Sequence, residues 1–176
     1  LQMLRETRKV AHFSDTPLPL KTYHNIHEGN ALRIDWAEVL TGKECTQGIP
    51  SPLYIIGNPP FIGYSLQSVE QKEDMLNTLV DVNGKPYKQA GKIDYVSGWY
   101  YKACKMMEAQ PTIKAAFVST NSITQGEQVA GLWKPLVEQF GIHIDFAYPT
   151  FRWDSESNLK AHVHCIIIGF SYIYDP

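Results

Sequence analysis

The chain has 176 residues, 44% of them hydrophobic and 19% charged, which is ordinary for a globular protein and sufficient for one domain with a hydrophobic core. Its formal net charge at pH 7 is -2, so the chain as a whole has no electrostatic attraction for nucleic acid. This excludes a uniformly basic nucleic-acid-binding protein, and any phosphate-binding surface has to be local or belong to parts outside this chain.

The pattern of cysteines and the short lengths of the apolar runs both indicate a cytoplasmic protein. Cys45, Cys104 and Cys165 are odd in number, lie far apart and form no C-x-x-C pair, which fits reduced thiols rather than a disulfide framework. No apolar stretch approaches the roughly 20 residues that span a bilayer, and no signal peptide opens the chain. We therefore expect a cytoplasmic protein without a membrane partner.

The first part of the chain predicts few regular elements. Leu1 to about Ala11 is typical of the end of a helix, and a loop punctuated by prolines follows. His24 to Glu28 predicts a short strand that ends at Gly29-Asn30. Because the chain starts within what reads as a helix, we expect it to be a fragment cut from a longer polypeptide.

Leu53 to Gly57 is a continuous apolar run and predicts a strand inside a parallel sheet. The four residues that follow, Asn58-Pro59-Pro60-Phe61, are called the NPPF loop below. Its prolines remove two backbone donors and fix two φ angles, so the strand has to end here. We expect the Asn58 amide and the Pro59 carbonyl to face outward as acceptors for an –NH2 group, with Phe61 covering the flat ring that carries it. The alternative is a plain strand-ending turn, since Asn and Pro favour turns for local reasons.

Two helices and a strand are predicted between the NPPF loop and residue 120. Ser68 to about Leu79 is a polar helix candidate, and Ile93 to Met107 is a clear amphipathic helix with Asp94 as its N-cap. Ala115 to Thr120 predicts a buried strand that ends at Asn121.

The C-terminal part predicts one more helix and a hairpin. An amphipathic stripe runs from Val129 to Phe140, and we expect Pro135 to kink or divide that helix. His143 to Pro149 and Ala161 to Phe170 are predicted strands joined by too few residues for a parallel crossover, so we expect an antiparallel hairpin. Alternating strands and helices that end in a hairpin predict a three-layer α/β fold with one reversed strand.

Three of the predicted strands end in an asparagine, namely Asn30, Asn58 and Asn121. Ligands of open α/β sheets bind at the carboxyl ends of the strands. A single Asn at such a place is commonly a turn former. Three of them in one sheet, one within the NPPF loop, favour a shared binding site.

The NPPF loop resembles motif IV of the amino-group methyltransferases, (D/N/S)PP(Y/F), in its adenine-N6 form. Further blocks are similar to other motifs of these enzymes and cover nearly the whole chain: residues 29–36 resemble motif III, 94–100 motif V, 116–123 motif VI, and 151–153 with 160–170 motif VIII. The amino-acid sequence of these blocks is most similar to that of the large single-chain type II restriction–modification enzymes related to MmeI. In those enzymes a nuclease, a methyltransferase and a target-recognition region share one polypeptide.

This resemblance implies a Rossmann-like class I methyltransferase fold with a mostly parallel sheet, of which residues 1–176 form the C-terminal portion of a single catalytic domain. It implies transfer of a methyl group from S-adenosylmethionine to the N6 amino group of an adenine flipped out of double-stranded DNA. The setting implied is a restriction–modification system in the bacterial cytoplasm, with the other regions of the same polypeptide as partners.

The resemblance also implies roles for individual residues. The catalytic set is Asn58, Pro59, Pro60 and Phe61. The cofactor-binding set is Asn30, Ala31, Leu32 and Asn58. The residues that stack on the flipped base are Phe61, Phe151 and Trp153. No metal is expected, because His162 and His164 have no third ligand of suitable spacing.

The chain departs from the family pattern in one respect, since it contains no Gly-x-Gly. The glycine-rich loop for the methionine end of the cofactor, and the acidic residue for its ribose, are therefore expected to precede Leu1. We expect the chain on its own to bind S-adenosylmethionine weakly or not at all and to be inactive. Two alternatives stay open: a methyltransferase acting on protein glutamine or RNA, and a non-catalytic binding or structural module.

Overall fold

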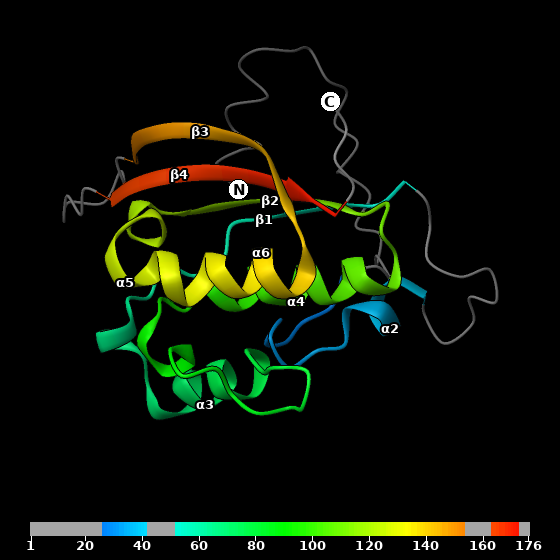
Figure 1. Cartoon of the computed structure of the whole chain (residues 1–176), viewed down its shortest axis with the longest axis horizontal. Coiled ribbons are helices and arrows are strands. Elements are labelled where there is room, and N and C mark those ends of the chain that lie inside the picture. Colours follow the sequence, from blue (N-terminus) through cyan, green and yellow to red (C-terminus); the bar gives the residue numbers. More distant parts are fainter. Residues whose placement is uncertain (1–25, 42–51, 154–162, 173–176) are drawn as a thin grey trace, which may run out of the picture.

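The computed structural model describes residues 26–41, 52–153 and 163–172, which are built around a mixed four-stranded sheet (Figure 1). The strands are β1 (Tyr54–Gly57), β2 (Lys114–Thr120), β3 (His143–Trp153) and β4 (Val163–Ser171), in the spatial order β1-β2-β4-β3. β1 and β2 are parallel, and β4 is antiparallel to both of its neighbours. These findings confirm the strands predicted beyond residue 52 and the C-terminal hairpin.

Of two further predictions about the sheet, one stays a prediction and the other is wrong for its described part. Of the three pairings just given, one is parallel and two are antiparallel, so a mostly parallel sheet stays a prediction about a larger sheet than these four strands. The strand predicted at His24 to Glu28 is wrong for its described part, because Ile26 to Glu28 pair with no described strand and Ile26 is 74% exposed. Leu1 to Ala11 and Cys45 lie outside the described residues.

The labelled helices all lie on one side of the sheet in Figure 1. α4 (Ser97–Ala109) and α6 (Lys134–Phe140) cover the sheet, while α3 (Val69–Thr78) packs on the side of α4 that faces away from it. The short α2 (Trp36–Thr41) lies near the end of α4. No helix in the described ranges is long and apolar enough to cross a membrane.

The core between α4 and the sheet is built on aromatic rings. Tyr100 stacks on Phe170 with 5.3 Å between ring centroids, and it meets Phe117 and Trp133 edge-on at 5.1 and 5.4 Å. The Tyr100 hydroxyl is satisfied inside this core by a 2.8 Å hydrogen bond with the Ser119 hydroxyl. Burial and this partner together fix the position of α4 on β2.

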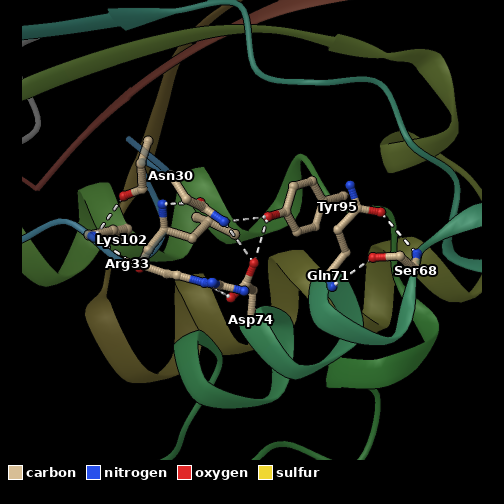
Figure 2. Close-up of polar contacts among 9 residues, drawn as sticks. Asn30, Arg33, Ser68, Gln71, Asp74, Tyr95 and Lys102 are labelled. Atoms are coloured by element: carbon tan, nitrogen blue, oxygen red, sulfur yellow. Dashed lines mark hydrogen bonds and ion pairs between the residues drawn. The ribbon is translucent and has the colours of Figure 1, made fainter. Parts of the chain in front are cut away.

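Helix α3 begins at a capping box. The Ser68 hydroxyl accepts from the Gln71 N–H, and the Gln71 side chain accepts from the Ser68 N–H (Figure 2). Helix α4 differs from its prediction, because it starts at Ser97 and its N-cap position is Val96. Asp94 is not an N-cap, since its carboxylate binds groups of two other loops, and only its backbone carbonyl accepts from the Ser97 N–H.

Pro135 divides the last helix as expected. α5 (Gly126–Gln128) and α6 (Lys134–Phe140) are separated by a π-helical turn, Val129–Trp133. Proline has no N–H for the carbonyl four residues earlier, and its ring crowds that carbonyl, so a wider turn there relieves both problems. α6 then ends at Gly141, whose φ of 64° is the left-handed conformation that glycine adopts readily.

The second face of the sheet carries exposed apolar side chains. Ile56 and Phe146 lie on it, because their partners Ala116 and Gly169 are themselves neighbours across β2 and β4. Ile56 is 82% exposed and Phe146 is 45% exposed. The described residues thus supply the sheet and one helical layer, and the predicted third layer is not among them.

Candidate functional site

The NPPF loop follows β1 directly, at the carboxyl end of that strand. Asn58 is exposed, Pro59 is buried and Phe61 is half-buried. Within the described part of the chain, neither the Asn58 amide nor the Pro59 carbonyl has a hydrogen-bond partner. Both acceptors are thus unused within the described residues, and an aromatic ring lies in the same loop.

The segment just after the NPPF loop is fastened to the start of α4. The Tyr95 N–H donates to the Ile62 carbonyl at 2.9 Å, and the Tyr64 N–H donates to Asp94 Oδ1 at 3.1 Å. The first of these bonds joins two backbone groups, and the second joins a backbone N–H to the Asp94 carboxylate. The segment that follows the NPPF loop is thus tied to the residues just before α4.

Asp94 also joins this loop to the end of β2. Its carboxylate, only 6% exposed, accepts from the Ser122 hydroxyl, which is in turn 2.8 Å from the Thr120 hydroxyl. Gln128 accepts from the Asp94 N–H at 2.9 Å and so adds the start of the last helix. One buried carboxylate therefore connects the carboxyl ends of the two parallel strands.

Asn121, the third predicted asparagine, follows β2 and is half-buried. Its amide oxygen accepts from the Thr150 hydroxyl at 2.9 Å, which links it to β3 next to Phe151. Phe151 is half-buried. The side chain of Trp153 lies outside the described residues, so the aromatic wall opposite Phe61 stays a prediction.

The residues from Asn30 to Ile34 form a tight turn, called the Asn30 turn below. The Asn30 carbonyl accepts from the N–H groups of Arg33 and Ile34 at 2.9 and 3.1 Å. The Asn30 side-chain oxygen accepts from the Leu32 N–H at 2.9 Å. Its side-chain nitrogen donates to Asp74 at 2.8 Å (Figure 2).

Asp74 is a nearly buried carboxylate of α3 on which several donors converge. Besides Asn30, Arg33 Nε donates to it at 2.6 Å and the Tyr95 hydroxyl at 3.0 Å (Figure 2). Burial acts to raise the pKa of the Asp74 carboxyl, but the hydrogen bonds from Arg33, Tyr95 and Asn30 outweigh burial and hold that pKa below its ordinary value. Asp74 is therefore charged at neutral pH.

Lys102 of α4 holds the Asn30 turn from the other side. Its ammonium group donates to the carbonyls of Ala31, Leu32 and Ile34, at 2.8 and 3.1 Å for the first two, and lies 5.4 Å from the Trp36 ring centroid. Burial lowers the pKa of the Lys102 ammonium. Three carbonyls bound by one cation leave the turn little freedom.

Asp94 and Tyr95 are the point at which the two loops meet. Asp94 and the Tyr95 backbone bind the segment after the NPPF loop, and the Tyr95 hydroxyl binds Asp74, the partner of Asn30. The predicted cofactor turn and the segment after the predicted catalytic loop are therefore joined through consecutive residues just before α4.

Sequence reasoning did not find Asp74 or Lys102. Asp74 lies on a helix that reads as polar, where an acidic residue is usually solvated, and it is 44 residues from Asn30. Lys102 is 71 residues from Ala31. No pattern in the sequence marks either residue, because the partners of both lie far away along the chain.

An open cavity of about 730 Å³ lies between the Asn30 turn, α3 and α4, with Trp36, Asp74 and Lys102 among its lining residues. No residue of the NPPF loop lines it. Across the described ranges, no group of three or more His, Cys, Asp or Glu is arranged to hold a metal ion. His162 lies outside those ranges, and His164 is exposed on β4.

Comparisons with known proteins indicate one family. A family model described as "MmeI, DNA-methyltransferase domain" matches residues 1–175. "DNA methyltransferase A" of Bacillus subtilis (strain 168) is 41% identical over 171 residues, which are 96% of this chain and 18% of that protein. A solved structure of the Type IIL restriction-modification enzyme MmeI in complex with DNA matches with a TM-score of 0.74 and 42% identity, over 98% of this chain and 21% of that one. The chain thus spans about a fifth of the length of these relatives.

Proposed function

Because the chain belongs to the MmeI DNA-methyltransferase domain family, we propose that it supplies the target-base half of an S-adenosylmethionine-dependent methyltransferase. The proposed target is the N6 amino group of an adenine flipped out of duplex DNA, within a restriction–modification enzyme. The relatives carry the words DNA methyltransferase and restriction-modification in their names, and the adenine specificity is our inference from the NPPF loop.

The observation that carries this proposal is the pair of free acceptors at the end of β1. An adenine amino group is a poor nucleophile, because its lone pair is delocalised into the ring. Asn58 Oδ1 and the Pro59 carbonyl accept its two hydrogens, favour a pyramidal nitrogen and so raise the electron density available to an incoming methyl group. Neither acceptor is consumed elsewhere in the described structure.

Flipping a base out of the duplex costs a few kcal/mol. Phe61 lies within the NPPF loop and is half-buried, which leaves part of its ring for the base. With Phe151 or Trp153 on the opposite side, stacking offsets the cost by about 1–3 kcal/mol per stacked base. These aromatic residues thus select a flat ring, while the two acceptors select its amino group.

S-adenosylmethionine would supply the methyl group from its sulfonium. The Asn30 turn fits the adenine end of that molecule, because the Asn30 side-chain oxygen uses one lone pair for Leu32 and retains a second. Ala31 and Leu32 are held in place beside it by Lys102. We propose that the glycine-rich loop for the methionine end comes from another part of the polypeptide.

The test is Asn58→Ala in the full-length protein, with labelled S-adenosylmethionine and duplex DNA. We expect methyl transfer to fall by about 100-fold or more, the range seen when a polar group that stabilises a transition state is removed. Thermal stability should stay unchanged, since Asn58 is exposed and bonds no described group. Asn83→Ala, an exposed loop asparagine, is the matched control and should keep full activity.

Mass spectrometry of the product distinguishes the candidates. N6-methyladenine in DNA is the expected product. Label in protein glutamine or RNA instead would favour the alternative methyltransferases, and a full-length protein without any transfer would favour a binding or structural module. Methylation of DNA at a near wild-type rate by Asn58→Ala would show that the proposed role of Asn58 is wrong.

A further inference from the structure

Asn30 can offer a ligand either an acceptor or a donor, depending on which way its side-chain amide faces. An amide has one oxygen and one nitrogen, and rotation by half a turn exchanges them. In the structure the oxygen accepts from Leu32 N–H within the turn, and the nitrogen donates to Asp74 at 2.8 Å and, less closely, to the Tyr95 hydroxyl at 3.4 Å. The neighbours of Asn30 therefore decide what the turn presents.

Asp74 is an acceptor only, because its charged carboxylate has no hydrogen to donate. Its Oδ2 accepts from the Asn30 nitrogen and from the Tyr95 hydroxyl, while its Oδ1 accepts from Arg33 Nε. A reversed Asn30 amide would place its oxygen against this carboxylate and its nitrogen against the Leu32 N–H. Both contacts would be repulsive, so one orientation alone is compatible with a charged Asp74.

We propose that Asp74 is a positioning residue that locks the Asn30 amide with its oxygen as the acceptor, so that the Asn30 turn selects a cofactor purine with an exocyclic amino group over one with an oxo group. The inference rests on the proposed function, because it assumes that this turn binds the purine. It adds to that function a residue outside the NPPF loop and a stated chemical selectivity.

The probe is a pair of ligands that differ only at the purine: S-adenosylhomocysteine, with an amino group, and its deaminated inosyl analogue, with an oxo group. Dissociation constants of both are measured by calorimetry with the full-length protein. The wild type should prefer the amino compound by about tenfold or more, the value of one hydrogen bond lost and one polar group left unpaired.

Asp74→Asn should reduce this preference towards 1. Arg33, which is a donor only, selects the oxygen of the new amide and leaves its nitrogen facing Asn30. If the Asn30 amide keeps its orientation, its nitrogen faces the nitrogen of the new amide, and two donors oppose each other. If the Asn30 amide reverses, its oxygen no longer accepts from the Leu32 N–H. Glu73→Gln removes a charge from an exposed neighbour on α3 and should keep the wild-type preference.

The reciprocal swap Asn30→Asp with Asp74→Asn is the decisive variant. The carboxylate introduced at position 30 accepts from the Leu32 N–H with one oxygen and from the amide introduced at position 74 with the other, so the acceptor towards the purine is restored. The swap should regain most of the wild-type preference, whereas Asn30→Asp alone places two carboxylates together and should not. A purely structural role for Asp74 would alter melting temperature and leave the ratio of the two affinities unchanged.

An unchanged ratio in Asp74→Asn overturns the inference, and so does a swap that fails to fold or to restore the preference. A wild type that binds both ligands equally also overturns it, while the proposed function stands. A wild type that binds neither ligand and methylates no DNA overturns the proposed function itself.

Discussion

The charged carboxylate of Asp74 binds side chains from several segments of the candidate site. Its carboxylate is 6% exposed and receives hydrogen bonds from three side chains of different segments, Asn30, Arg33 and Tyr95. Of these partners, Arg33 alone carries a charge, and it is 57% exposed. Solvent therefore screens the charge of Arg33, and the hydrogen bonds from Tyr95 and Asn30 add to the stabilisation of the charged carboxylate.

The pH dependence of stability follows from this environment. The pKa of Asp74 is lower in the folded protein than in the unfolded chain, so its contribution to stability is full above about pH 4, the ordinary value for aspartate. It is lost as the pH falls through the lowered pKa of the folded state. We expect the urea midpoint of the wild type to fall as the pH drops below about 4, and Asp74→Asn to show a shallower fall. A wild-type slope in that variant would mean that other carboxyl groups dominate acid unfolding.

Residue-level prediction succeeded where the information was local. The NPPF loop was recognisable from the sequence, because two prolines and the strand before them fix the geometry without help from distant residues. Asp94 illustrates the opposite case: its position suggested an N-cap, yet the Ser122 hydroxyl and the Tyr64 N–H, 28 and 30 residues away, take its carboxylate. Partners of that kind are set by the packing of loops, which a single sequence does not reveal.

Among the elements, α4 is the one that connects the core to the site. Tyr100 faces the sheet, while Gly98 faces the Asn30 turn and lets Leu32 approach closely. A Cβ added at Gly98 would lie 2.9 Å from one Leu32 methyl carbon, closer than real contacts allow. The helix prediction was correct in kind, and its start at Ile93 was too early because the turn before Ser97 belongs to the loop network.

Gly98→Ala should therefore weaken the binding of S-adenosylhomocysteine by the full-length protein about tenfold, since Leu32 has to move together with the Asn30 turn. The change in melting temperature should be small, because alanine favours a helix over glycine by up to about 1 kcal/mol and offsets the crowding. Gly91→Ala, whose new Cβ would make an ordinary 3.9 Å contact with Leu76, is the control for the substitution itself. Wild-type affinity in Gly98→Ala would show that the turn can shift without harm to the ligand.

At the scale of the whole molecule, the proposed function assigns this chain one half of a site. It matches its relatives over nearly its full length but spans about a fifth of theirs. It has the free acceptors after β1 and the Asn30 turn, and it has no Gly-x-Gly for the methionine end of the cofactor. The α/β class and the hairpin were predictable from periodicity and loop length, whereas the third layer stays a prediction, because the described helices lie on one face of the sheet.

We accordingly expect the 176-residue chain alone to bind S-adenosylmethionine weakly or not at all, and the full-length protein to bind it well. Calorimetric titration of both proteins under the same conditions compares the two affinities directly. Equal and tight binding by the two would contradict the division of the cofactor site proposed above.

The exposed sheet face also governs how stability varies with temperature. Apolar surface that is already wet in the folded state adds nothing to the heat capacity of unfolding, which for ordinary domains is about 12–15 cal/mol/K per residue. With Ile56 at 82% exposure and Tyr148 at 61%, the chain alone should fall below that range and have a flatter stability curve. Burial of this face by other parts of the polypeptide would make the curve steeper, so the curvature measured for this chain by itself would not be that of the assembled protein.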